Sequence, residues 1–209
     1  MPKTRLKNPI LSDFQKERIN KGELHGIEVI NTFDYAEEAL AIALEQNLTI
    51  MGTSDIHGLI SWDYDEKGSN RPITLVFAKE KSLESLQEAL IEGRTVAVYN
   101  ALMVGKPEYL IPLIHASIHV TSAQYLPNTQ ILKVELTNNS SSSLLFENQM
   151  DYTFYSSSPV FEIPAQGTYT LFIKTIKIKE SIDLKLRAIG TYVAPKQSPD
   201  VVWNISVEK

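Results

Sequence analysis

Cysteine is absent from this chain of 209 residues, and histidine occurs only four times. The lack of cysteine excludes disulfide scaffolds, zinc sites with thiolate ligands and thiol nucleophiles. It leaves the redox compartment open, because a chain without cysteine suits reducing and oxidising surroundings equally well. The scarcity of histidine means that any metal site has few imidazole ligands to draw on.

Long apolar runs are also absent, since no stretch approaches the ~20 residues that cross a bilayer. Residues 1–6 carry charge but are not followed by the apolar segment of a signal peptide. We therefore expect a soluble protein with no membrane partner and an unknown compartment; a longer form could be secreted or periplasmic.

Clusters of positive charge are missing as well. The chain has 25 acidic and 20 basic residues, a net charge of −5, and its Lys and Arg residues are scattered. Nucleic-acid backbones are bound by basic patches, so no nucleic-acid partner is expected. The sequence also contains no phosphate-binding Walker loop and no G-x-G-x-x-G fingerprint.

The first half of the chain alternates between strand and helix patterns. Ser12 and Gln15 form a capping box that predicts a helix over residues 12–20, and residues 26–30 form an apolar strand. Asp34 is the expected cap of the next helix, which Asn47 ends in a left-handed conformation. The apolar residues of that helix recur at helical spacing: Ala36, Ala39, Leu40, Ala43 and Leu44.

Three further apolar segments predict strands at residues 48–52, 73–78 and 95–99. Between the last two lies a helix that Ser82 caps and Gly93 ends, with Leu83, Leu86, Leu90 and Ile91 on one face. Strands alternating with helices in this way are typical of parallel βα units that are buried on both faces.

The pattern changes from about residue 114. Apolar and polar residues now alternate along residues 114–121, 132–137, 182–187 and 201–207, with turn residues between these segments. Such half-buried strands predict an antiparallel β-sandwich of immunoglobulin-like character, with no helix beyond residue 115. The expected domains are thus a βα domain over residues 1–113 and a sandwich over residues 114–209.

One short motif carries possible chemistry. Asp55 and His57 follow the strand at residues 48–52, at the carboxyl edge of a βα sheet, where active sites assemble. Two residues of extended chain put both side chains on one side, so a carboxylate oxygen and an imidazole nitrogen can face one divalent cation. A helix cap or an ordinary surface pair explains the same residues, and local evidence alone favours that reading.

The wider sequence resembles the late part of the PHP (polymerase and histidinol phosphatase) family of metal-dependent phosphoesterases. Residues 26–31 read Gly-Ile-Glu-Val-Ile-Asn, and residues 54–57 read Ser-Asp-Ile-His. These match a family strand of the form G-I-E-V-x-N, which a helix and a strand ending in S-D-x-H follow. Residues 73–99 are similar to the family's closing segment, and the tail to the C-terminal domain of its phosphodiesterase-like branch. The resemblance spans nearly the whole chain, but only residues 26–58 are distinctive.

The resemblance implies half of a TIM-like βα barrel followed by an immunoglobulin-like sandwich. It also implies bound zinc, manganese or iron ions, with Asp55 and His57 among their ligands. Water activated by these ions would hydrolyse a small phosphorylated substrate. The family's H-x-H motif is missing, however, and two residues fall short of the three ligands that a catalytic metal needs. The chain is then either completed by an N-terminal half or partner chain, or is an inactive remnant that acts as a binding or structural module and holds no metal.

Other residues near the motif are weaker candidates. Asn31 ends the family-like strand and could bind substrate or orient a ligand, whereas Glu28 is a candidate for a buried polar contact. Trp62 and Tyr64 could contact substrate or anchor their loop on the core. His25 lies at the entry end of its strand, where a surface role is expected.

The remaining candidates lie further along the sequence. His115 and His119 could bind zinc only on a helix, and the alternation around them instead predicts the polar face of a strand. Arg71 and Arg94 could approach a phosphate, but Arg94 follows a helix end, where a cation is stabilising in any case.

Overall fold

The computed structural model describes residues 10–64 and 70–208, which form two compact units. The first unit consists of Met1–Tyr109 with Val193–Lys196, and the second of Leu110–Tyr192 with Gln197–Lys209. Helix α5 (Pro107–Ser117) contains the point where the chain passes from one unit to the other. The expected boundary between residues 113 and 114 lies inside this helix.

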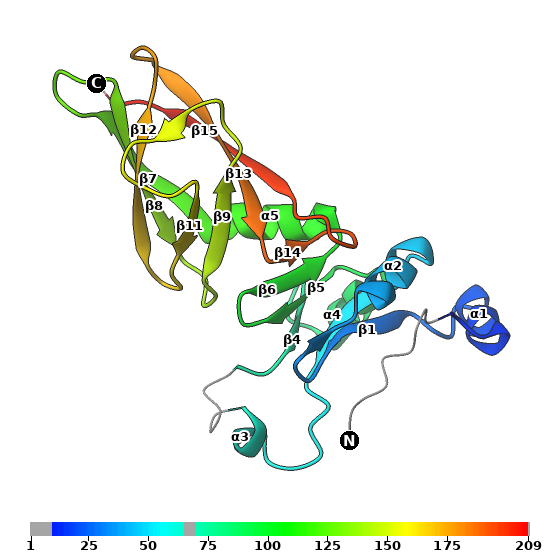
Figure 1. Cartoon of the computed structure of the whole chain (residues 1–209). Helices are drawn as coiled ribbons and strands as arrows, with labels where there is room; N and C mark the ends of the chain where they lie inside the picture. Colours follow the sequence, from blue (N-terminus) through cyan, green and yellow to red (C-terminus); the bar gives the residue numbers. More distant parts are fainter. Residues whose placement is uncertain (1–9, 65–69, 209) are drawn as a thin grey trace. The chain divides into compact units, whose positions relative to one another are not determined.

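The first unit is a βα assembly (Figure 1). Its elements, in chain order, are α1 (Asp13–Asn20), β1 (Gly26–Asn31), β2 (Asp34–Tyr35), α2 (Glu37–Glu45), β3 (Thr49–Thr53), α3 (Ile60–Asp63), β4 (Ile73–Val76), α4 (Leu83–Ile91), β5 (Thr95–Tyr99) and β6 (Leu102–Gly105). Strand β1 lies between β2 and β3, and β5 lies between β4 and β6. Helix α2 packs on β1 and β3 with Leu40 and Ala43 buried.

Side-chain hydrogen bonds join the two groups of strands in this unit. The hydroxyl of Thr74 accepts from the backbone N–H of Gly52 and donates to its carbonyl, both at 3.0 Å. The hydroxyl of Thr95 donates to the carbonyl of Ile50 at 2.7 Å. Strand β3 is therefore held between β1 on one side and β4 and β5 on the other.

Several predicted helix ends are confirmed, and one is wrong. Ser12 and Gln15 form the capping box of α1, Ser82 caps α4, and Asn47 has a left-handed φ of 52°. Asp34 does not cap α2, which begins at Glu37 after Ala36 and has no side-chain cap. Asp34 lies in β2 opposite Asn31, because the chain turns back on β1 before the helix starts.

The prediction of parallel strands is correct for β1 and β3 and wrong for the later pair. Strands β4 and β5 run antiparallel, with Val76 opposite Thr95, and β6 forms an antiparallel hairpin with β5 that the sequence reading missed. Helix α4 brings the chain back to the C-terminal end of β4, so that β5 starts beside the residue where β4 stops. The hydrogen bond from Phe77 N–H to Arg94 O shows this. A short apolar run has no feature that distinguishes parallel from antiparallel pairing.

The second unit is the predicted β-sandwich. After α5 its strands are β7 (Ile118–Tyr125), β8 (Ile131–Asn138), β9 (Leu144–Asn148), β10 (Thr153–Phe154), β11 (Val160–Ile163), β12 (Thr168–Lys174), β13 (Ser181–Ile189), β14 (Thr191–Tyr192) and β15 (Asp200–Ser206). Two sheets, β10-β12-β8-β7 and β11-β9-β13-β15, enclose the core. Along β13 every second residue is buried, as the alternation of Ile182, Leu184 and Leu186 with polar residues predicts.

The structure corrects the prediction at the start of this unit. Residues 114–117 form the last turn of α5 rather than the beginning of a strand, and β7 starts at Ile118. Leu110 and Ile114 are both buried, one helical turn apart. The apolar residues Ile114 and Ile118 are four positions apart, a spacing that fits a helix and an alternating strand equally well.

No helix in the described part of the chain is long and apolar enough to span a membrane.

Candidate metal site at the ends of β1 and β3

The motif lies where the parallel strands β1 and β3 end together. Asn31 is opposite Thr53 in the register, and the N–H of Thr32 donates to Thr53 O at 3.1 Å. Asp55 follows β3 by two residues. The structure thus places Asn31 and Asp55 at the same carboxyl edge of the sheet, as a parallel arrangement requires.

Asp55 and His57 face one another. The Oδ1 atom of Asp55 is 3.5 Å from Nε2 of His57, and the two side chains are 49% and 88% exposed. Ligands that lie 2.0–2.2 Å from a tetrahedral cation are separated by about 3.4 Å, so this spacing matches two neighbouring positions in such a coordination sphere. Their exposure leaves the cation side of the pair open to solvent and to further ligands.

The loop that carries the pair is anchored by Tyr64. This side chain is 1% exposed, its hydroxyl donates to the carbonyl of Ser54 at 2.9 Å, and its ring lies 5.2 Å from that of Phe33. Ser54 directly precedes Asp55, which adopts a left-handed φ of 51° that aspartate tolerates better than most residues. Tyr64 therefore fixes the backbone at the point where the chain turns the carboxylate outward.

Trp62 differs from Tyr64 in being exposed. Its ring lies over Gly58, where a Cβ atom would be 3.4 Å from Trp62 Cε3. Of the two aromatic residues considered for this loop, Tyr64 is the anchor, and Trp62 lies beside the residue that follows His57.

Asn31 and Glu28 form a hydrogen-bonded network on one face of the sheet. Glu28 accepts from Asn31 Nδ2 at 2.9 Å and from Thr53 Oγ1 at 2.7 Å, and Asn31 Oδ1 accepts from Thr32 Oγ1 at 2.9 Å. Glu28 is exposed rather than buried, so the expectation of a buried polar contact is wrong. The contact of Thr53 with Glu28 was missed, although both residues point to the same face of paired strands.

The other histidines are not brought to this edge. His25 precedes β1 at the opposite end of the strand and is exposed. His115 lies in the last turn of α5, where the centroid of its ring is 5.0 Å from that of Trp203 in an edge-on arrangement and burial lowers its pKa. The placement of His115 on the polar face of a strand is therefore wrong, whereas His119 does lie exposed on β7.

Of the two candidate arginines, Arg94 makes its contacts away from the site. Arg94 donates through Nε to Phe77 O at 3.1 Å and pairs with Glu88 and Glu92, so its guanidinium is committed within the α4–β5 connection. Arg71 is exposed next to the start of β4.

The candidate ligands amount to part of a metal site. Among residues 10–64 and 70–208, no group of three or more His, Asp or Glu side chains is arranged to hold a metal ion. Asp55 and His57 therefore offer one carboxylate oxygen and one imidazole nitrogen at a spacing suited to a single cation, and the described residues bring no third such side chain beside them.

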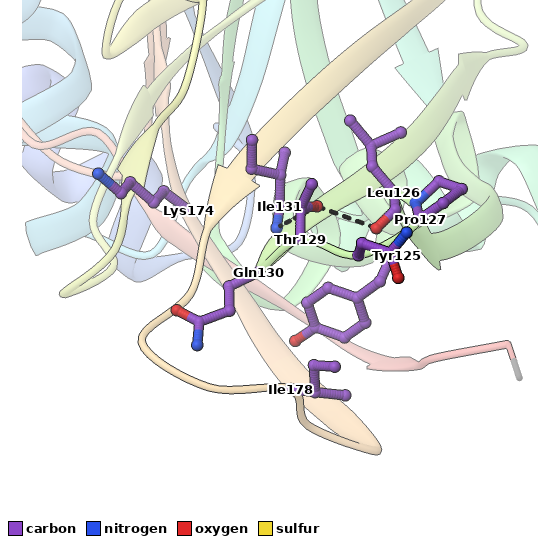
Figure 2. Close-up of a pocket in the computed structure, with 9 residues that line it drawn as sticks. Tyr125, Leu126, Pro127, Thr129, Gln130, Ile131, Lys174 and Ile178 are labelled. Atoms are coloured by element: carbon purple, nitrogen blue, oxygen red, sulfur yellow. Dashed lines mark hydrogen bonds between the residues drawn. The ribbon is translucent and has the colours of Figure 1, made fainter.

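The sandwich carries a separate surface depression of about 760 Å³. Figure 2 shows its wall of residues from the β7–β8 turn, where Thr129 Oγ1 donates to Leu126 O at 2.9 Å and accepts from Ile131 N–H at 3.1 Å. Lys174 is the only charged residue among those lining it: Tyr125, Leu126, Pro127, Asn128, Thr129, Gln130, Ile131, Lys174 and Ile178. This lining offers no carboxylate or imidazole for catalysis or metal binding.

Among the comparisons with known proteins, the match to a family model covers the second half of the chain. Residues 118–204 match a family model described as an Ig-like domain, in agreement with the two-sheet structure. Comparison with curated protein sequences finds no match.

A solved structure resembles nearly the whole chain. It is a two-domain protein from Bacteroides vulgatus that contains a predicted PHP-like metal-dependent phosphoesterase, with 30% sequence identity and a TM-score of 0.81. The similarity covers 95% of this chain but only 57% of that protein. A relationship to PHP-like phosphoesterases is therefore suggested by structure as well as by the Ser54–His57 motif, over little more than half of the neighbour's length.

Proposed function

We propose that this chain carries the late part of a PHP-like phosphoesterase site, in which Asp55 and His57 are two of the metal ligands. The observation that supports this most directly is the 3.5 Å separation of Asp55 Oδ1 and His57 Nε2 at the carboxyl edge of β1 and β3. The first unit would then be the later portion of a PHP-type barrel, and the similarity to the Bacteroides vulgatus protein agrees with that.

Each residue has a defined task in this proposal. The carboxylate of Asp55 and the neutral imidazole of His57 bind the cation, and Tyr64 holds the backbone before Asp55 so that both ligands face outward. Asn31 lines the substrate's side of the edge, with its carboxamide oriented by Glu28 and Thr32. A bound zinc, manganese or iron ion supplies Lewis-acid chemistry, activating water and offsetting charge on phosphoryl oxygens.

The substrate class is a small phosphate ester, and the remaining ligands come from an N-terminal half or a partner chain. The test measures hydrolysis of bis(p-nitrophenyl) phosphate with added manganese or zinc by the complete protein, in which the segment or partner that supplies the remaining ligands is present, with Asp55 intact and with Asp55→Ala. We expect the variant to lose at least about a hundredfold in rate, because loss of one of few ligands empties the site. Equal rates in the two proteins would show that Asp55 is not a ligand.

A second candidate function follows from the shortage of ligands. Without a third ligand the first unit is an inactive remnant, and the chain serves as a binding or structural module. Metal analysis separates the two: less than one divalent ion per chain, together with no hydrolysis after metal addition, favours the module.

A further inference from the structure

The connection between β12 and β13 exposes two large apolar side chains of the sandwich. Ile176 is 83% exposed and Ile178 67%, and only one residue separates them. A single exposed isoleucine is ordinary on a protein surface, but two on one short loop form a local apolar surface. We name residues 174–180, from the end of β12 to the residue before β13, the β12–β13 tip.

Hydrogen bonds hold this tip in a defined conformation. The N–H and the hydroxyl of Thr175, which is 2% exposed, both donate to Gln130 O at 3.0 Å. The hydroxyl of Tyr125 lies 3.1 Å from Thr175 Oγ1 and accepts from the N–H of Lys179 at 3.1 Å. One phenol oxygen thus bonds to both sides of residues 176–178. Because the loop is ordered in advance, its isoleucines can make a contact without a further cost of ordering the backbone.

Positive charge accompanies the two isoleucines. Lys174 and Lys177 are exposed, and Lys179 is half-buried. Glu180 is the one acidic residue of the β12–β13 tip, which therefore has a formal charge of +2, whereas the whole chain has a net charge of −5. A surface that combines exposed isoleucines with lysines is complementary to one that is both apolar and anionic.

The shape of the surface distinguishes between possible occupants. Ile178 and Lys174 help to line the depression of about 760 Å³ seen in Figure 2. A second depression, of about 390 Å³, has as many lysines as aspartates in its lining: Asp151, Asp183, Lys179 and Lys185. Ile176 lines neither depression and is the more exposed of the two isoleucines. A side chain that projects from a loop fits a soft layer that it can enter better than the flat surface of a folded protein.

We propose that the β12–β13 tip docks on a bilayer that contains anionic phospholipids, with Ile176 and Ile178 entering the boundary between headgroups and acyl chains. Burial of the apolar side chains and attraction of the lysines to phosphate groups both favour binding. Lysine stems lie along apolar surface while their ammonium groups remain among the headgroups. The expectation of no membrane partner followed from the lack of a spanning segment, which a loop bound at the surface does not need.

The experiment measures co-sedimentation of the 209-residue chain with lipid vesicles in a buffer with EDTA. Vesicles of phosphatidylcholine and phosphatidylserine in equal parts are compared with vesicles of phosphatidylcholine alone. We expect at least about tenfold tighter binding to the mixed vesicles, because each lysine near an anionic surface contributes about fivefold. Added salt should weaken this binding, since it screens the attraction.

Two variants separate the apolar from the charged contribution. Ile176→Ser/Ile178→Ser should weaken binding to mixed vesicles at least about tenfold, because little apolar area is left to enter the bilayer. Lys177→Gln should weaken it about fivefold and leave the weak binding to phosphatidylcholine unchanged. Leu83→Ser/Ile91→Ser is the matched control: it removes two exposed aliphatic side chains from α4 and should leave the affinity unchanged. Circular dichroism verifies that each variant is folded.

No binding of the wild type to mixed vesicles, or equal affinity of Ile176→Ser/Ile178→Ser, would overturn the proposal. Binding to polyglutamate but not to vesicles, lost in the same double variant, would assign the tip to an acidic polypeptide and also overturn it. So would a wild-type dimer that does not bind vesicles and becomes monomeric in this variant, since the tip would then bind a second copy. Because EDTA removes metal, the result is independent of the assignment of Asp55 and His57.

Discussion

The two units differ in how completely they bury their apolar residues. In the sandwich, alternate residues of facing strands fill a closed core, in which the large side chain of Phe146 is fully buried. In the βα unit, α2 covers one face of β1 and β3, but α4 keeps Leu83, Leu86 and Ile91 exposed. The sandwich thus closes its core with its own strands, whereas the βα unit leaves large apolar side chains of α4 exposed among the described residues.

The largest expected effect tests the closed core of the sandwich. Phe146→Ala should reduce its free energy of unfolding by about 3–5 kcal/mol, because it leaves a cavity beside Phe161 and Trp203. The chain has two tryptophans, one in each unit, so Trp203 fluorescence during urea unfolding reports on the sandwich when Trp62 is replaced by Phe. A loss below about 1 kcal/mol would contradict a tightly packed core.

A smaller effect tests the polar interior of the βα unit. Lys106 is 7% exposed and donates through Nζ to Asn47 Oδ1 at 2.6 Å, just after the end of α2. Lys106→Met should cost about 1.5–3 kcal/mol of unfolding free energy, because the Asn47 side chain loses a charged partner. The exposed Lys196→Met, which removes a 4.0 Å pair with Glu37, is the control and should change stability by less than about 0.5 kcal/mol.

A third substitution, at Tyr64, should change stability mainly within the loop of the candidate site. Tyr64→Phe removes the bond to Ser54 O and should cost about 1 kcal/mol. Amide hydrogen exchange is expected to speed up about fivefold in residues 54–64 and to stay unchanged in β8. Exposed Tyr155→Phe provides the comparison, and a loop indifferent to Tyr64→Phe would show that the ring packing alone anchors it.

The smallest effect concerns pH and His115. Burial lowers the pKa of this histidine, so the folded sandwich disfavours its charged form. As pH falls below the ordinary histidine value of about 6.5, the unfolded chain takes up a proton that the folded one resists, and stability declines. The thermal midpoint should fall less between pH 7.5 and 5.5 in His115→Gln than in the wild type. If the exposed His119→Gln variant reduces the pH dependence of the thermal midpoint by the same amount, burial of His115 is not its cause.

Patterns that depend on one segment were readable from the sequence. The capping residues Ser12 and Ser82, the left-handed Asn47 and the alternation along β13 each follow from local geometry, and the structure has all of them. The nearness of Asp55 to His57 is also local, since only one residue separates them.

Features that depend on distant segments could not be read in the same way. The direction of β5 relative to β4 is set by how α4 returns the chain, and the hairpin of β5 with β6 depends on tertiary pairing. The link from Thr53 to Glu28 joins residues 25 positions apart. Which face of α4 is exposed depends on what else packs there, because an apolar stripe at helical spacing is the same whether covered or not.

The most direct test of the central claim is a zinc titration followed by NMR of the imidazole protons, with the four histidines resolved. The account predicts that zinc shifts the His57 signals first, leaves His25, His115 and His119 unmoved at the same concentration, and binds at least about tenfold more weakly in Asp55→Ala. If His57 responds no more strongly than His25, or equally well without the Asp55 carboxylate, the two residues do not form a metal site.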